Sequence, residues 1–209
     1  MEWIPVQSRQ SEGGLRNLPL IAVDLGFAGD GNRSCGVAWG NEPASCEEME
    51  FGAAVSRVSE LLQINRESVL ILEAPLSGAF SASGNPCARG EFEREPQRRY
   101  WYVQPGSGIA LAAELFVRRP IQAVGLENGT VHIVEGFVTR VTGQHRHKRV
   151  AVALRRAFLD PQTPGTYWHS VKRGGNIHSV IVLFGSDANE AHSPVPVILK
   201  LPEADLAEL

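Results

Sequence analysis

The amino-acid sequence predicts an α/β fold, in which a mixed β-sheet carries helices on its faces. Two apolar runs, at residues 19–25 and 68–74, read as buried strands. The first is followed by a turn rich in Gly, Asp and Asn and by a second apolar run at residues 35–40, which is the pattern of an antiparallel hairpin. The run at 68–74 is continuously apolar, as in a central parallel strand. Because residues 53–63 between these strands have helical apolar spacing, the elements alternate as they do in α/β proteins.

The other elements follow from local composition and periodicity. A long segment with many Gly, Pro, Ser and Arg residues covers residues 76–105, a length that is usually functional or mobile inside a domain. Around it the sequence predicts a short strand near 46–51, a helix over 107–118, a strand over 130–138, a helix over 144–158, a segment ambiguous between strand and buried helix over 177–184, and an extended end over 193–202.

Composition limits the class of protein. The 209 residues are 43% hydrophobic and 21% charged, which predicts one soluble globular domain over residues 18–209 after a flexible N-terminal arm over residues 1–17. The apolar runs are too short to cross a bilayer, and the N-terminus lacks the pattern of a signal peptide. Three widely spaced cysteines imply neither a zinc site nor a disulfide framework, so we expect a cytoplasmic protein. The net charge of −3 argues neither for nor against nucleic-acid binding.

Three apolar runs each carry one acid near the C-terminal end: LIAVD with Asp24, VLILE with Glu73 and VHIVE with Glu135. If the three strands are neighbours and parallel, the carboxylates meet at one edge of the sheet, where they repel each other unless a cation joins them. Mg²⁺ or Mn²⁺ would resolve this conflict, and two such ions can drive phosphodiester hydrolysis. The alternative is that each acid marks a strand end in solvent or caps a helix.

The order of the elements and the positions of the acids resemble the RNase H-like fold, with its mixed five-stranded sheet and helices on both faces. The stretch LILEAPLSGAFSASGNPCARGEFER, residues 70–94, is similar to a group of predicted RNase H-like nucleases of unknown biological role, as are AVDLG and IVEGF. The resemblance implies a metal-dependent nuclease that hydrolyses phosphodiester bonds of DNA or RNA. It implies Asp24, Glu73 and Glu135 as the catalytic metal ligands.

One acid that is usual in such nucleases is missing from this sequence. They usually place a further acid at the start of the last helix, and the equivalent stretch here, GGNIHSVIVLF, has none. His178 is the nearest residue able to bind a metal and is our candidate fourth catalytic ligand, although it could equally be a hydrogen-bonded core histidine. Asp187 is the other candidate. The missing acid also leaves open a catalytically degenerate binding module on the same fold.

Arginine and aromatic residues are concentrated in the segment that follows Glu73. Arginines neutralise phosphates and aromatic rings stack on unpaired bases, so this segment is a candidate nucleic-acid contact. Alternatively, its arginines pair with nearby glutamates and its rings pack on the core. A second basic patch, QHRHKR, begins the helix predicted over 144–158, where a phosphate partner would offset the unfavourable helix dipole. The candidate nucleic-acid-binding residues are Arg89, Arg94, Arg98, Arg99, Tyr100 and Trp101.

Two other function classes match parts of the pattern. The VDLG turn also occurs in actin-like and sugar-kinase-like nucleotide-binding proteins, but 209 residues leave little room for their second lobe. A sugar hydrolase with paired carboxylates would not explain the arginine–aromatic segment. Metal-dependent cleavage separates the nuclease from these classes, and nucleotide binding identifies the kinase-like class.

Overall fold

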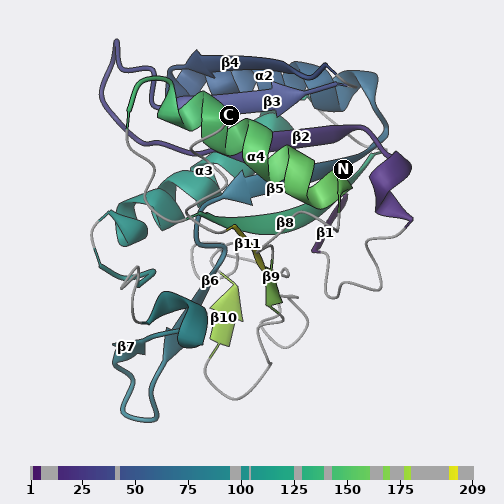
Figure 1. Cartoon of the computed structure of the whole chain (residues 1–209). Coiled ribbons are helices and arrows are strands. Elements are labelled where there is room, and N and C mark those ends of the chain that lie inside the picture. Colours follow the sequence, from purple (N-terminus) through teal and green to yellow (C-terminus); the bar gives the residue numbers. More distant parts are fainter. Residues whose placement is uncertain are drawn as a thin grey trace.

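The computed structural model describes residues 2–5, 14–40, 43–94, 100–103, 105–124, 129–138, 143–160, 167–169, 177–179 and 198–201. Its main feature is a large mixed sheet with helices on both faces (Figure 1). The strand order is β4 (Ser45–Met49), β3 (Cys35–Trp39), β2 (Leu20–Asp24), β5 (Glu67–Glu73), β8 (Thr130–Val138), β11 (Ile198–Leu201) and β9 (Tyr167–His169).

The strand directions give the sheet an RNase H-like topology. Strands β2, β3 and β4 form an antiparallel meander, and β5 and β8 then add in parallel on the other side of β2. This order confirms the α/β fold class and the mixed five-stranded core predicted from the sequence. Beyond that core, β11 adds in parallel to β8 and β9 adds antiparallel to β11.

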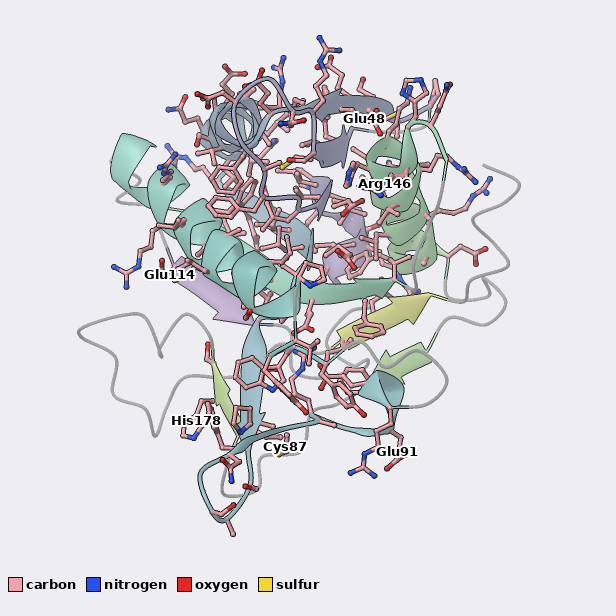
Figure 2. The ribbon with its side chains drawn as sticks, turned by 90° about the vertical axis from the view of Figure 1, so that its left-hand side faces the viewer. Glu48, Cys87, Glu91, Glu114, Arg146 and His178 are labelled. Carbon is pink, nitrogen blue, oxygen red and sulfur yellow. The ribbon has the colours of Figure 1, made fainter. Side chains whose placement is uncertain are left out.

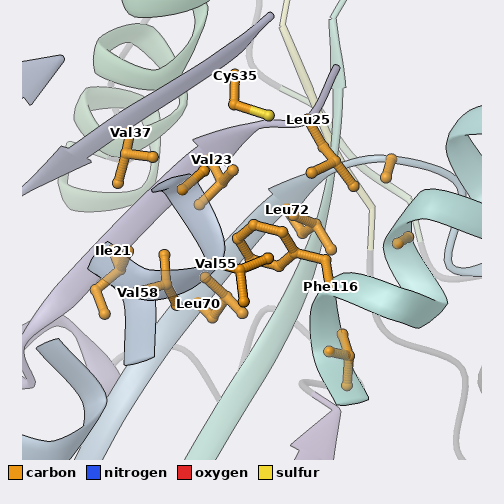
Figure 3. Close-up of a cluster of buried hydrophobic side chains, with 14 of the residues drawn as sticks. Ile21, Val23, Leu25, Cys35, Val37, Val55, Val58, Leu70, Leu72 and Phe116 are labelled. Atoms are coloured by element: carbon orange, nitrogen blue, oxygen red, sulfur yellow. The ribbon is translucent and has the colours of Figure 1, made fainter. Parts of the chain in front are cut away.

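The helices cover the two faces of the sheet unequally. Helices α2 (Phe51–Ile64) and α3 (Gly106–Val124) pack on one face, and α4 (Arg146–Leu159) is the described α-helix on the other, over β2, β3 and β4 (Figure 1). Alternate residues of each strand therefore enter different cores. Ile21, Val23, Leu70 and Leu72 pack with Phe116 on the α2–α3 face (Figure 3). The core on the α4 face includes Leu20, Ala22, Val69, Ile71, Leu154 and Phe158.

The N-terminal residues depart from the prediction of a flexible arm. Residues Glu2–Pro5 form β1, which pairs in parallel with residues 130–133 of β8. The physical reason is the length of β8: β11 covers only residues 135–138 of the same edge, so β1 satisfies backbone groups that would otherwise be unpaired. Residues 1 and 6–13 of the predicted arm lie outside the described residues.

The long segment after β5 contains a second, smaller sheet. Strand β6 (Ser77–Phe80) pairs antiparallel with β7 (Pro86–Cys87) and with β10 (Ile177–Ser179). This resolves the ambiguity of residues 177–184 where they are described, since residues 177–179 are a strand. Two short 3₁₀ helices, η1 (Leu15–Asn17) and η2 (Glu91–Glu93), complete the described elements. No helix in the described part of the chain has the length and hydrophobicity needed to cross a membrane.

Candidate functional site

One register row of the large sheet carries three carboxylates. Across five neighbouring strands, Glu48 of β4 lies opposite Gly36 of β3, Gly36 opposite Asp24 of β2, Asp24 opposite Glu73 of β5, and Glu73 opposite Gly136 of β8. Residues in register point to the same face of a sheet, and this face is the one that α4 covers. Neighbouring strands are about 4.8 Å apart, so Asp24 and Glu73 are adjacent carboxylates. We call Glu48, Asp24 and Glu73 the carboxylate row.

His147, at the start of α4, contacts the middle carboxylate of this row. Its Nδ1 lies 2.9 Å from Oδ2 of Asp24, and both side chains are more than four-fifths buried. The Nε–H of Arg146 donates to Nε2 of His147, so the ring proton is on Nδ1 and is donated to Asp24. The start of α4 thus places the side chain of His147 directly on Asp24, the acid at the end of β2.

Glu48 holds the start of α4 in place. It accepts hydrogen bonds from the backbone N–H groups of His147 at 3.1 Å and Lys148 at 3.3 Å, and its Oε2 is 2.9 Å from Nδ1 of His145. His145, the N-cap residue, has the left-handed φ of 53° and makes no side-chain cap of its own. Glu48 supplies that cap from strand β4. Its negative charge also offsets the positive charges that cluster at the N-terminal end of the helix.

Glu48 should make the stability of the protein depend on pH. Burial opposes its ionisation, but the hydrogen bonds from His145, Lys148 and His147 outweigh burial and lower its pKa. A lowered pKa in the folded state stabilises the fold at pH values above the unfolded pKa, and this stabilisation is lost as the pH falls through the folded pKa. We expect Glu48→Gln to lower the midpoint of urea unfolding at pH 7. The difference in midpoint between wild type and this variant should become smaller below about pH 4. A gap that is the same at pH 7 and at about pH 3.5 would contradict this ionic role.

Two glycines make room for α4 above the row. A Cβ on Gly36 would overlap the backbone carbonyl of His147, and a Cβ on Gly136 would lie 2.9 Å from Cδ2 of Leu154. The absence of a side chain at position 36, between Glu48 and Asp24, is what lets His147 reach both acids.

Replacing Gly36 therefore tests the geometry of the site. We expect Gly36→Ala to push the start of α4 away, to break the hydrogen bond between His147 and Asp24, and to destabilise the fold by about 1–3 kcal/mol, the usual cost of overpacking. Gly52→Ala in α2 is the matched control, because a Cβ there meets open space and alanine favours a helix. Equal stability of G36A and G52A in urea unfolding would mean that α4 does not approach β3 this closely.

Glu135 does not join the row. It lies opposite Leu72, one residue before the row, and therefore points to the α2–α3 face. Its fully buried carboxylate accepts from Nη1 of Arg89, with the shortest N–O separation 2.6 Å, and from the N–H of Leu76 at 2.9 Å. Arg89 also bonds to Glu93 through Nε at 2.8 Å. The predicted meeting of three acids in one row thus holds for Asp24 and Glu73, whereas Glu135 lies one register position earlier on the other face of the sheet, although it lines the same pocket as Glu73.

Glu93, Arg89 and Glu135 form a closed ionic cluster that we call the buried triad. Burial lowers the pKa of Arg89, but the two glutamates outweigh burial and raise it, so the guanidinium stays charged. Burial raises the pKa of Glu135, against the opposing effect of Arg89 and of the N–H of Leu76. The sequence predicts a nucleic-acid contact for Arg89, but its side chain is 1% exposed and its charge is used inside the protein.

His178 also lies away from the carboxylate row. The last described helix is α4, and His178 is in the strand β10, paired opposite Gly78 of the small sheet. Its ring meets Phe80 edge-on at 5.7 Å. Figure 2 shows His178 and Cys87 at one end of the molecule and Glu48 and Arg146 at the other. The start of the last helix instead carries His147, which the sequence presents only as part of the basic patch QHRHKR. Asp187 lies outside the described residues.

The arginine–aromatic segment is partly structural. Trp101 donates from Nε1 to the carbonyl of Cys87 at 3.0 Å and meets Phe80 edge-on. Tyr100 stacks on Tyr102 with ring centroids 5.4 Å apart. Arg94 is exposed and paired with Glu91. Arg98 and Arg99 lie outside the described residues.

In the part of the chain that the structure describes, the adjacent carboxylates of Asp24 and Glu73 are a donor pair that suits a hard divalent cation. Among the described residues, no three His, Cys, Asp or Glu side chains are close enough together to bind one metal ion. Magnesium, however, is usually held by one or two carboxylates, with waters and substrate phosphates completing its shell. The adjacent carboxylates of Asp24 and Glu73, at the C-terminal ends of two central strands, meet that requirement. Glu135 does not meet it, because it points to the other face and is paired with Arg89.

Comparison with known proteins adds no family assignment. No family model, no curated protein and no solved structure matches this chain. The topology of the sheet and the carboxylate row are therefore the basis for any functional conclusion.

Proposed function

We propose that this protein is a divalent-metal-dependent nuclease that hydrolyses phosphodiester bonds of DNA or RNA at the carboxylate row. The observation that carries the proposal is the pairing of Asp24 and Glu73 in register at the ends of two central parallel strands, beneath a histidine of the last helix. In open α/β sheets, sites form at the carboxyl ends of such strands.

Asp24 and Glu73 are the proposed ligands of Mg²⁺ or Mn²⁺. The ion would supply Lewis acidity, lowering the pKa of a bound water and stabilising charge on the phosphate. His147 is a positioning residue: by donating to Oδ2 of Asp24 it fixes the orientation of that carboxylate. Glu48 fixes the start of α4 and thus the position of His147.

The surface beside the carboxylate row carries cationic side chains that favour the binding of a polyanion. His145, Arg146 and Lys148 are exposed at the start of α4, next to the residue that contacts Asp24. Figure 2 places Arg146 beside Glu48 at this end of the molecule. Cations at this position would bind the phosphates of DNA or RNA on either side of the cleaved bond.

A catalytically inactive binding module on the same fold is the second candidate. The buried triad favours it, because Arg89 neutralises the acid that the family resemblance assigns as third ligand.

Purified protein incubated with single-stranded and duplex DNA and RNA separates the candidates. We expect cleavage with Mg²⁺ or Mn²⁺ and none with EDTA. Binding without cleavage in every metal would support the inactive module. Binding of ATP measured by calorimetry, with neither cleavage nor binding of nucleic acid, would support the nucleotide-binding class.

A further inference from the structure

A pocket opens beside the carboxylate row, between the C-terminal ends of β5 and β8 and the segment that leads into α3. Glu73, the proposed metal ligand, is part of its wall, together with Pro75 and Gly136 at the strand ends. Tyr100 and Trp101 also line the pocket, and we call them its aromatic wall. The pocket thus shares a residue with the proposed metal site, so a molecule bound in it lies next to the reacting phosphate.

The two rings of the aromatic wall are held by contacts within the protein. The indole of Trp101 is bonded to the carbonyl of Cys87 and packs against Gly78, where a Cβ would lie 2.9 Å from the ring. Tyr100 is held by its stack on Tyr102. Tyr100 and Trp101 remain partly exposed, and Val103 at the rim is 46% exposed. Rings that are held rigidly and remain accessible lose little entropy when another flat ring stacks on them.

The charges at the pocket exclude a phosphate from it. Glu73, Glu135 and Arg89 line it, and Arg89 is already shared between Glu135 and Glu93. Among the described residues, two glutamates line the pocket and Glu93 shares the one arginine, so these groups are net negative as long as no metal ion is bound at Glu73. A phosphate would be repelled, whereas a neutral flat ring with N–H donors at its edge would not.

We propose that the pocket binds one unpaired nucleobase, so that the substrate is single-stranded or locally unpaired nucleic acid. This inference rests on the proposed function and adds the form of the substrate. The base stacks on Tyr100 and contacts Trp101 at a steep angle, because Tyr100 is nearly parallel to Tyr102 and Trp101 lies at 79° to Tyr102. The neighbouring phosphate lies at Asp24 and Glu73. A base inside a duplex is paired and stacked and cannot enter without being extruded.

Binding to the cleavage-silent Asp24→Asn protein tests the inference. The probes are three fluorescein-labelled DNAs of roughly ten nucleotides: a single strand, the same sequence as a blunt duplex, and an abasic strand with all its phosphates and no bases. We expect the single strand to bind about tenfold more tightly than the other two in fluorescence anisotropy, since one stacked base contributes a factor of this order.

Variants of the aromatic wall and rim give the residue-level test. Tyr100→Ala should weaken single-strand binding about tenfold and leave abasic binding unchanged, and Tyr100→Phe should restore it. Val103→Asp, at an exposed position, should also weaken single-strand binding and serves if Tyr100→Ala unfolds. Equal affinity for the single and abasic strands, or unchanged single-strand affinity in both Y100A and V103D, would overturn the inference. Failure of wild-type cleavage with this binding pattern intact would instead overturn only the nuclease activity.

Discussion

Asp24→Asn is expected to reduce metal-dependent cleavage by at least about 100-fold while leaving the melting temperature of the metal-free protein unchanged or raised. Loss of a group that merely orients a metal ligand costs about 10–100-fold in many sites, so loss of a ligand should cost at least the upper value. Asparagine keeps an oxygen that can accept the hydrogen bond from His147. It also removes one of two adjacent negative charges, which repel each other without a cation.

The measurements are a cleavage time course and thermal unfolding with and without Mn²⁺. Metal should stabilise wild type more than D24N, because a ligand that binds only the folded state adds stability in proportion to its affinity. Asp30→Asn is the control, since Asp30 is an exposed acid in the turn between β2 and β3. A D24N protein that melts well below wild type without metal and gains as much from Mn²⁺ would make Asp24 a structural residue.

Strand boundaries explain why Asp24 and Glu73 share one register row and Glu135 does not. Asp24 and Glu73 are the last residues of β2 and β5, whereas Glu135 is followed by three more residues of β8. The three peptides look alike when they are aligned at the acid, but the register is set by strand pairing, and a shift of one residue moves a side chain to the other face. The strand predicted over 130–138 already continues past Glu135, so this signal is present in the sequence.

Other residues of the site depend on packing that local sequence does not encode. Glu48 and His147 are 99 positions apart and meet only because Gly36 lets α4 lie close to β3. The fold was easier to predict from the sequence than the site, because β2, β3, β5, β8 and the three helices follow hydrophobic periodicity. β1 was not, because a four-residue strand is selected by the free edge of β8 rather than by its own composition.

Loss of the cation from the buried triad should destabilise the fold more than Gly36→Ala or Glu48→Gln. Arg89→Met keeps approximate volume and removes the charge that Glu93 and Glu135 share, leaving two buried carboxylates without a cation. Removing one partner of a buried ion pair typically costs about 3–5 kcal/mol, and we expect a loss of that size in the free energy of urea unfolding at pH 7. Arg94→Met is the matched control, because its ion pair with Glu91 is exposed and should contribute at most about 1 kcal/mol.

The pH dependence of R89M identifies the cause of that loss. Without Arg89, burial and the nearby charge of Glu93 raise the pKa of Glu135, and the hydrogen bond from the N–H of Leu76 is left as the opposing effect, so we expect this pKa to lie above its value in the unfolded chain. A raised pKa in the folded state costs stability as the pH rises and costs none once the group is protonated in both states. The gap between R89M and wild type should therefore shrink as the pH is lowered from 7 toward about 4. Glu135→Gln, which leaves the Arg89–Glu93 pair intact, should destabilise far less than R89M. An R89M gap that does not change with pH would mean that lost packing, not unpaired charge, is responsible. An E135Q protein as stable as wild type but as inactive as D24N would return Glu135 to the metal site.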